Sequence, residues 1–177
     1  MNKLHYSLEF YKMTQDILLH PVFAETRSYV HHGPGNSLFD HSVSTAFFAY
    51  RVAKRLRLSS EDVRSITRAA LLHDFTGYDW RAGKREIRGR GLKRIWNMHA
   101  FQHGFSAAEH ASKFFWLTDR QRDAIKKHMF PLVPMAPRYK EGWIVTYSDK
   151  VVASREMGLV VWQAMKKAGG SLRRAFA

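Results

Sequence analysis

The chain has 177 residues, of which 45% are hydrophobic and 14% aromatic. This length and composition predict one globular domain with a core of its own, and they exclude a disordered chain. The absence of cysteine excludes disulfides, zinc fingers and thiol catalysis, so nitrogen and oxygen atoms must hold any metal ion. The 29 basic and 15 acidic residues give a net charge of +14, which favours anionic ligands such as phosphate esters, nucleic acid or anionic lipid.

The sequence carries no signal for a membrane or for export. No stretch approaches 18 uncharged apolar residues, which is the length that a transmembrane helix needs. The N-terminal residues 1–6 contain no uninterrupted apolar run of the kind that a secretory signal requires. We therefore expect a cytoplasmic protein that does not act at a membrane.

The first half of the chain shows four stretches with apolar residues at helical spacing. Pro21 stops the first of them, and a turn-rich loop, residues 31–36, follows the second. Asp40 and His41 fall in the first turns of the third. Serines and early acids at 59–62 open the fourth, as capping residues do. The helices are expected at residues 4–19, 22–30, 37–58 and 60–74.

The second half begins with a basic segment, residues 81–94, which carries seven basic residues, one acid and three glycines. We expect a mobile loop that closes over an anionic substrate, although a charged surface loop would have the same composition. A helix rich in small residues follows His103, and the Thr118–Gln121 capping box opens another that runs to His128. A last long helix is expected from Glu141 to Gly169–Gly170, followed by a basic tail. Since no sustained alternation of period two occurs, the predicted fold is an all-α bundle.

Six histidine and aspartate residues carry the strongest chemical signal. They fall at predicted helix ends or on apolar helix faces, with gaps of 32, 29, 25 and 21 residues that each match one helix plus one connection. Helix bundles build metal sites by presenting one such group from each of several helices to a common centre. Six ligands exceed the four that one zinc takes and suit two ions bridged by Asp74. The residues are His41, His73, Asp74, His103, His128 and Asp149.

The order of these residues resembles the H…HD…D signature of the HD superfamily of metal-dependent phosphohydrolases. The matching motifs are Asp40-His41-Ser42, Leu71-Leu72-His73-Asp74 and Tyr147-Ser148-Asp149-Lys150. His103-Gly104 and Lys127-His128 occupy the places of the two extra histidines in the dinuclear members. The chain is also similar to a bacterial group of uncharacterised HD proteins through two further motifs, residues 78–80 and 128–132. The resemblance covers about residues 27–156.

The resemblance implies a single HD-type all-α domain over residues 1–177, with a buried metal centre and with a C-terminal helix and basic tail in 157–177. It implies that His41, His73, Asp74 and Asp149 hold one divalent transition metal, and that Asp74, His103 and His128 hold a second. Nitrogen and oxygen ligands of this kind suit Fe, Mn, Co, Ni or Zn. The expected reaction is attack of a metal-bound hydroxide on a small phosphorylated compound, such as a nucleotide. Asp74, Lys150 and Arg81 are the expected catalytic residues, and Arg27, Arg81 and Lys150 the expected substrate-binding ones.

Several alternatives stay open at this point. His99 lies one helical turn before His103 and could replace it as a ligand, whereas His31, His32 and His110 are expected not to be ligands. A mononuclear 5′-nucleotidase would need only one of the two ions. The chain could also be a non-catalytic nucleotide- or nucleic-acid-binding regulatory module, or an oxygenase with a di-iron site.

Overall fold

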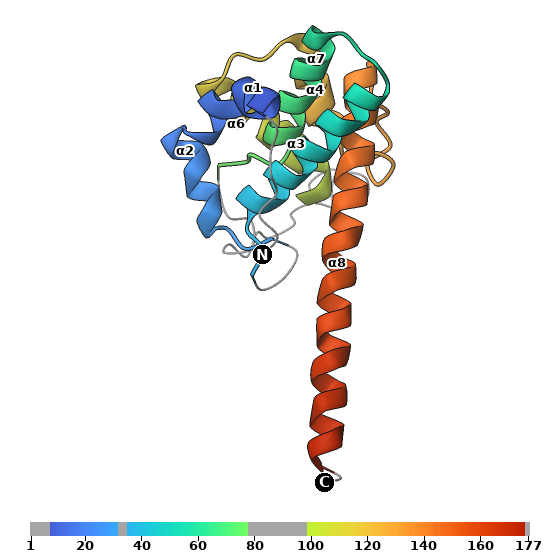
Figure 1. The fold of residues 1–177 in the computed structure, drawn as a ribbon. Helices are drawn as coiled ribbons and strands as arrows, with labels where there is room; N and C mark the ends of the chain where they lie inside the picture. The colour runs from blue at the N-terminus through green and yellow to red at the C-terminus, as the bar shows by residue number, and fades with distance from the viewer. Residues whose placement is uncertain (1–7, 32–34, 78–98, 176–177) are drawn as a thin grey trace, which may run out of the picture.

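The computed structural model describes residues 8–31, 35–77 and 99–175. Within these ranges the chain forms seven α-helices, one 3-10 helix and no β-strand, which confirms the predicted all-α bundle. The elements, shown in Figure 1, are α1 (Leu8–Leu18), α2 (Pro21–Ala24), the 3-10 helix η1 (Glu25–Ser28), α3 (Leu38–Arg55), α4 (Ser60–Leu72), α6 (His99–Phe114), α7 (Asp119–Lys127) and α8 (Lys140–Ala175).

Three helices begin at polar caps because the first backbone N–H groups of a helix have no partner inside it. Ser37 accepts a hydrogen bond from the backbone N–H of Asp40 at the start of α3, and Ser59 accepts one from Asp62 at the start of α4. Thr118 and Gln121 form the complete capping box that was predicted for α7. These caps fix where α3, α4 and α7 begin, and thereby which residues stand at their ends.

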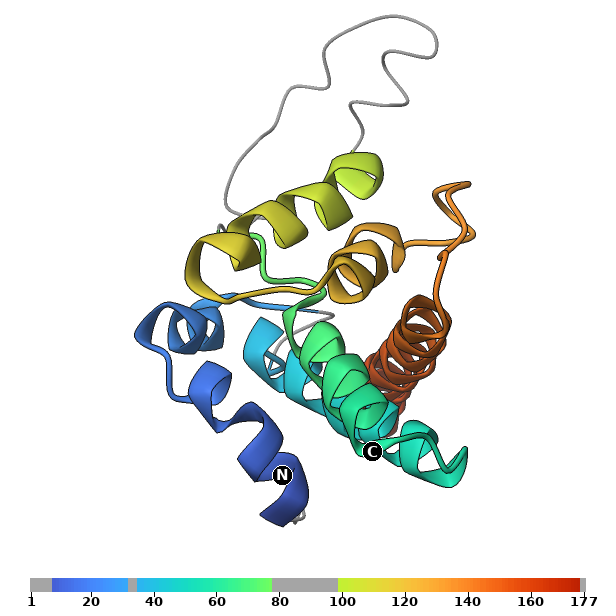
Figure 2. The ribbon, with the colours of Figure 1, turned by 90° about the horizontal axis from the view of Figure 1, so that it is seen from above.

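The helix α4 lies at the centre of the bundle, against α1, α3, α6, α7 and α8. Its apolar residues, among them Ile66, Leu71 and Leu72, are fully buried, and small residues such as Ala69 and Ala70 let the neighbouring helices approach closely. Seen from above in Figure 2, α3 and α4 run between α1 on one side and α7 and α8 on the other. This packing brings the N-terminal part of α3, the C-terminal ends of α4 and α7 and the N-terminal half of α8 to one region.

The segment before α3 differs from its prediction. A single helix was expected over residues 22–30, but the chain forms α2, then η1, and then pairs Val30 with Ser37 in an isolated antiparallel bridge. Pro21 is the first residue of α2, where its missing N–H would have had no partner in any case. Residues 29–31 are therefore held by backbone hydrogen bonds beside the start of α3.

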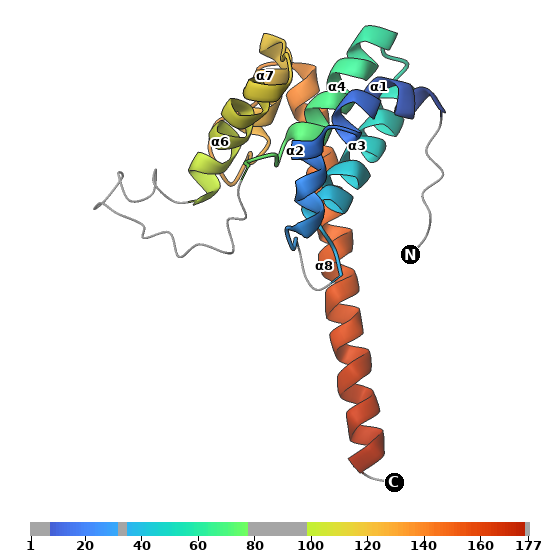
Figure 3. The ribbon, with the colours of Figure 1, turned by 90° about the vertical axis from the view of Figure 1, so that its left-hand side faces the viewer.

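The end of α8 also differs from its prediction. The helix was expected to end at Gly169-Gly170, but it continues to Ala175. A glycine inside a helix costs only about 1 kcal/mol relative to alanine, which disfavours a helix but does not end it. Figures 1 and 3 show that α8 runs well beyond the other helices. None of the described helices combines the length and the apolar character that crossing a membrane requires.

Candidate metal centre

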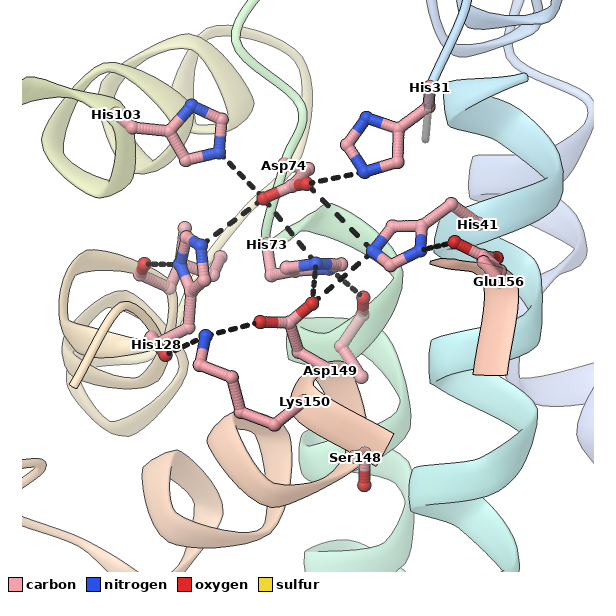
Figure 4. Close-up of polar contacts among 12 residues, drawn as sticks. His31, His41, His73, Asp74, His103, His128, Ser148, Asp149, Lys150 and Glu156 are labelled. Atoms are coloured by element: carbon pink, nitrogen blue, oxygen red, sulfur yellow. Dashed lines mark hydrogen bonds and ion pairs between the residues drawn. The ribbon is translucent and has the colours of Figure 1, made fainter. Parts of the chain in front are cut away.

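His73 and Asp74 stand where α4 ends, and His73 is its C-cap residue. The last carbonyl groups of a helix have no partner inside it. His73 Nδ1 satisfies one of them by donating to the Ala70 carbonyl oxygen at 2.7 Å. Because that nitrogen carries the proton, the lone pair of the neutral ring is on Nε2, which points into the centre shown in Figure 4.

His128 repeats this arrangement at the end of α7. It is the C-cap residue, and its Nδ1 donates to the Ile125 carbonyl oxygen at 2.7 Å. Its ring lies 5.0 Å from that of His73 between centroids, and both side chains are almost completely buried. The two helix ends therefore each present one imidazole Nε2, in a fixed tautomer, to the same space.

His41 and Asp149 enter the centre from α3 and α8. His41 Nε2 lies 3.3 Å from Asp149 Oδ1, and His73 Nε2 lies 3.6 Å from the same oxygen. Both residues are buried, and the three donor atoms lie within 4.8 Å of one another. Such a set of three donors, drawn from three helices, is of the kind that could hold one metal ion.

The two oxygens of Asp74 face different histidines. Oδ1 lies 2.7 Å from His103 Nε2, 3.2 Å from His128 Nε2 and 3.4 Å from His73 Nε2. Oδ2 lies on the other side, 3.9 Å from His41 Nε2. A carboxylate with donors on both sides is suited to bridge two ions (Figure 4).

His103 reaches Asp74 because α6 packs tightly on α7. The next residue, Gly104, is buried against the backbone of α7, and a Cβ there would overlap the Lys126 carbonyl oxygen. The glycine thus permits the close approach of the two helices that brings His103 over Asp74. The side chain of His99 lies outside the described residues, so its alternative role as a ligand stays a prediction.

The electrostatics of the centre favour charged carboxylates. Burial raises the pKa of Asp74, but the surrounding His73, His103 and His128 outweigh it and hold this pKa well below the usual range. Burial likewise raises the pKa of Asp149, but the neighbouring His41 and His73 outweigh it and hold this pKa well below the usual range. Both groups are therefore anionic near neutral pH, as metal-ligating carboxylates must be.

Lys150 lies at the edge of this centre. Its Nζ donates to Asp149 Oδ2 at 2.7 Å and to the His128 carbonyl oxygen at 3.4 Å, and its side chain is 42% exposed. Lys150 thus contacts the oxygen of Asp149 that does not face the histidines. Its ammonium group is placed between the ligand cluster and solvent.

Of the two arginines that were expected to bind substrate, the structure describes Arg27 only. The Arg27 guanidinium lies over the Phe39 ring, 3.5 Å from its centroid, and lines a shallow pocket of about 310 Å³ with Asp40. No contact described for Arg27 involves the six cluster residues. Arg81, the basic segment 81–94 and the motif at 78–80 lie outside the described residues, so their roles stay predictions.

Two residues that lie at the centre were not predicted from the sequence as part of the site. His31, which was expected not to be a ligand, is buried, and its Nε2 lies 3.7 Å from Asp74 Oδ2. Glu156 accepts a hydrogen bond from His41 Nδ1 at 2.9 Å. Glu156 lies seven positions after Asp149 on α8, which is two helical turns, so helical spacing could have found it. No comparable signal marks His31, because it lies in a loop.

Comparison with known proteins supports one family. A family model described as HD domain matches residues 38–154, which is more than half of the chain. The match begins with the first residue of α3 and ends within α8, so it contains all six predicted ligands. Neither a curated protein nor a solved structure matches the chain significantly.

Proposed function

Because this chain belongs to the HD domain family, whose members are typically metal-dependent hydrolases, we propose that it is a metal-dependent phosphohydrolase. The observation that carries the proposal is the convergence on Asp74 of histidines from α3, α4, α6 and α7. A purely structural cluster would not need so many buried ionisable groups, because each one carries a desolvation cost.

We assign the cluster to two divalent ions. His41, His73, Asp149 and Asp74 would hold the first, and Asp74, His103 and His128 the second. His103 and His128 both lie within 3.2 Å of Asp74 Oδ1, and this favours two ions over the one that a mononuclear 5′-nucleotidase would use. Imidazole and carboxylate ligands are those of Fe, Mn, Co, Ni or Zn rather than of Mg or Ca.

Bound divalent ions would supply Lewis acidity and a water molecule activated near neutral pH, so that no protein nucleophile is needed. The protein residues would then position the ions and neutralise the charge of the phosphoryl group. Asp74 would hold the two ions at a fixed separation. Lys150, with its ammonium group at the edge of the cluster, would contact a phosphoryl oxygen and stabilise the negative charge that develops in the transition state.

The substrate class that we propose is a small phosphorylated compound, such as a nucleotide. The net charge of +14 raises the local concentration of any anion and supports a phosphorylated substrate without choosing among them. Arg27 and Arg81 remain candidate substrate-binding residues. Arg27 would have to act from the neighbouring pocket in which its guanidinium lies over Phe39.

A screen of purified protein against generic aryl phosphate mono- and diesters, with Mn, Co or Ni added, tests this proposal. We expect hydrolysis that needs the metal and stops on adding a chelator, followed by turnover of nucleotides. Absence of turnover with every metal, together with nucleotide binding, would instead support a non-catalytic module. A steep fall of affinity with salt would identify nucleic acid as the ligand of such a module.

A further inference from the structure

Residues 29–31, which follow η1, are held beside the start of α3 by backbone hydrogen bonds. Val30 and Ser37 form an antiparallel bridge, and the His31 N–H donates to the Asn36 carbonyl oxygen at 2.9 Å. The Leu38 N–H, at the start of α3, donates to the Tyr29 carbonyl oxygen at 2.8 Å. These hydrogen bonds fix His31 beside the first turns of α3, which also carry His41.

The side chain of His31 points into the metal centre (Figure 4) and is buried, with 6% of the residue exposed. Its ring lies 4.4 Å from the His41 ring between centroids. Its Nε2 lies 3.7 Å from Asp74 Oδ2, the carboxylate oxygen that also faces His41. Donor atoms of His31, His41 and Asp74 lie within 4.8 Å of one another, as do those of two further sets that could hold a metal ion.

We propose that His31 is an additional ligand of the ion held by His41, His73, Asp149 and Asp74. This inference rests on the metal centre of the proposed function and extends it by one ligand outside the six-residue signature. Two ligands at about 2.0–2.2 Å from a common ion lie about 3–4 Å apart. The distances from Asp74 Oδ2 to His31 Nε2 and His41 Nε2, 3.7 and 3.9 Å, fall in that range.

The competing role for His31 is a hydrogen bond that only orients Asp74. A direct hydrogen bond between nitrogen and oxygen spans about 2.7–3.2 Å, which is shorter than the 3.7 Å observed. The separation therefore suits an ion between the two groups better than a direct contact. His31 would bring the candidate protein ligands of the first ion to five, which is more than a tetrahedral zinc site takes. Such a set of nitrogen and oxygen ligands would suit Mn, Fe, Co or Ni better than zinc.

X-ray absorption of the cobalt-loaded protein tests the proposal by counting imidazoles. The measurement is made on the His103→Ala/His128→Ala protein, in which only the first ion is expected to bind, with and without His31→Gln. Glutamine keeps an amide that can donate to Asp74 but is a poor metal ligand. We expect about three imidazoles per cobalt with His31 and about two without it, and cobalt affinity lower by at least about tenfold.

The matched control is His20→Gln, which removes a histidine that packs against the rings of Phe114 and Phe115. This variant should leave both the imidazole count and the affinity unchanged. Equal counts with and without His31→Gln would overturn the proposal while leaving the metal centre intact. Absence of cobalt binding in the wild-type protein would instead overturn the metal centre itself, and His31 as a ligand with it.

A second measurement needs no variant at the centre. Histidine-ring ¹⁵N NMR of the wild-type protein is recorded before and after cadmium is added, because this diamagnetic ion is not restricted to four ligands. We expect the Nε2 resonance of His31 to move to the position of a metal-bound nitrogen together with that of His41. An Nε2 resonance of His31 that keeps its position while that of His41 moves would contradict the proposal.

Discussion

Glu156 accepts a hydrogen bond from His41, with 2.9 Å between Oε2 and Nδ1, although 115 positions separate the two residues in the chain. This contact fixes the tautomer of His41, so that its Nε2 faces Asp149 and Asp74. A carboxylate behind a metal-ligating imidazole orients the ring and makes it a stronger donor. Glu156 is therefore part of the centre although it would not touch the metal.

Replacing Glu156 by alanine should weaken metal binding without abolishing it. Loss of a carboxylate partner of this kind lowers metal affinity by about tenfold to hundredfold. Competition with a chromophoric chelator measures the change, and Glu109→Ala, which removes an exposed acid of α6, is the control. Equal affinities of the Glu156→Ala and wild-type proteins would mean that the hydrogen bond does not support the metal site.

Replacing Gly104 by alanine should separate α6 from α7. A Cβ at this position would overlap the Lys126 carbonyl oxygen, and the backbone there cannot yield as a side chain could. We expect a loss of about 1–3 kcal/mol in the free energy of unfolding, and weaker binding of the second ion because His103 moves away from Asp74. Urea denaturation and metal titration measure the two effects.

The matched control for Gly104 is Gly158, which lies inside α8 with open space where a Cβ would be. Alanine is favoured over glycine in a helix interior by about 1 kcal/mol, so Gly158→Ala should stabilise the protein. Similar losses of stability in both variants would show that the close contact of α6 and α7 is not what requires Gly104.

Lys150→Ala should lower catalysis more than metal binding. Among the residues that the structure describes, Lys150 is the only lysine or arginine that forms an ion pair with Asp149. Groups that stabilise transition-state charge are worth about 10²–10³ in kcat. We expect kcat for an aryl phosphate to fall by at least about tenfold at unchanged metal content, whereas Lys166→Ala, far along α8, should have no effect. A loss of metal in proportion to activity would assign Lys150 to positioning Asp149 instead.

Metal binding should release protons. Burial lowers the pKa of His41, but the neighbouring carboxylates of Asp149 and Glu156 outweigh it and raise the pKa to about 10 in the metal-free protein. The bound proton stabilises the metal-free fold in full below the ordinary pKa of 6.5, and this contribution disappears as the pH rises through about 10. A metal ion must displace that proton, so its apparent affinity should fall as the pH is lowered.

Calorimetric titration with metal at about pH 8 in two buffers of different ionisation enthalpy measures this release. The apparent binding enthalpies should differ in proportion to the protons that the buffers take up. Identical enthalpies in both buffers would show that His41 is already neutral before the metal binds.

The sequence predicted the parts of the fold that local signals decide. Apolar spacing located α3 and α4, and the Thr118–Gln121 capping box located the start of α7. The same local signals gave wrong helix bounds where the preference for or against a helix was weak. The two glycines at 169–170 disfavour a helix without ending it. In residues 22–30, α2 and η1 replace the single expected helix, and Val30 pairs with Ser37.

The residues of the candidate site also differ in whether local sequence signals could predict them. The six residues of the H…HD…H…H…D pattern could be chosen from sequence because each stands at or near a helix end or on an apolar face. His31 could not, since its position depends on a bridge between loop residues that has no signature in the sequence. Arg27 was chosen for its charge alone. Its guanidinium packs on Phe39, and its role in substrate binding stays a prediction. The extent of the domain, residues 1–177 with a core at about 27–156, stays a prediction.

The number of metal ions bound per chain tests the central claim, that Asp74 bridges two ions, most directly. Elemental analysis is made on wild-type protein, on His103→Ala/His128→Ala and on Asp74→Ala, with circular dichroism to confirm that each is folded. We predict about two ions for the wild type, about one for the double histidine variant, and less than one for Asp74→Ala, since Asp74 serves both ions. An Asp74→Ala protein that keeps the wild-type metal content would contradict the account.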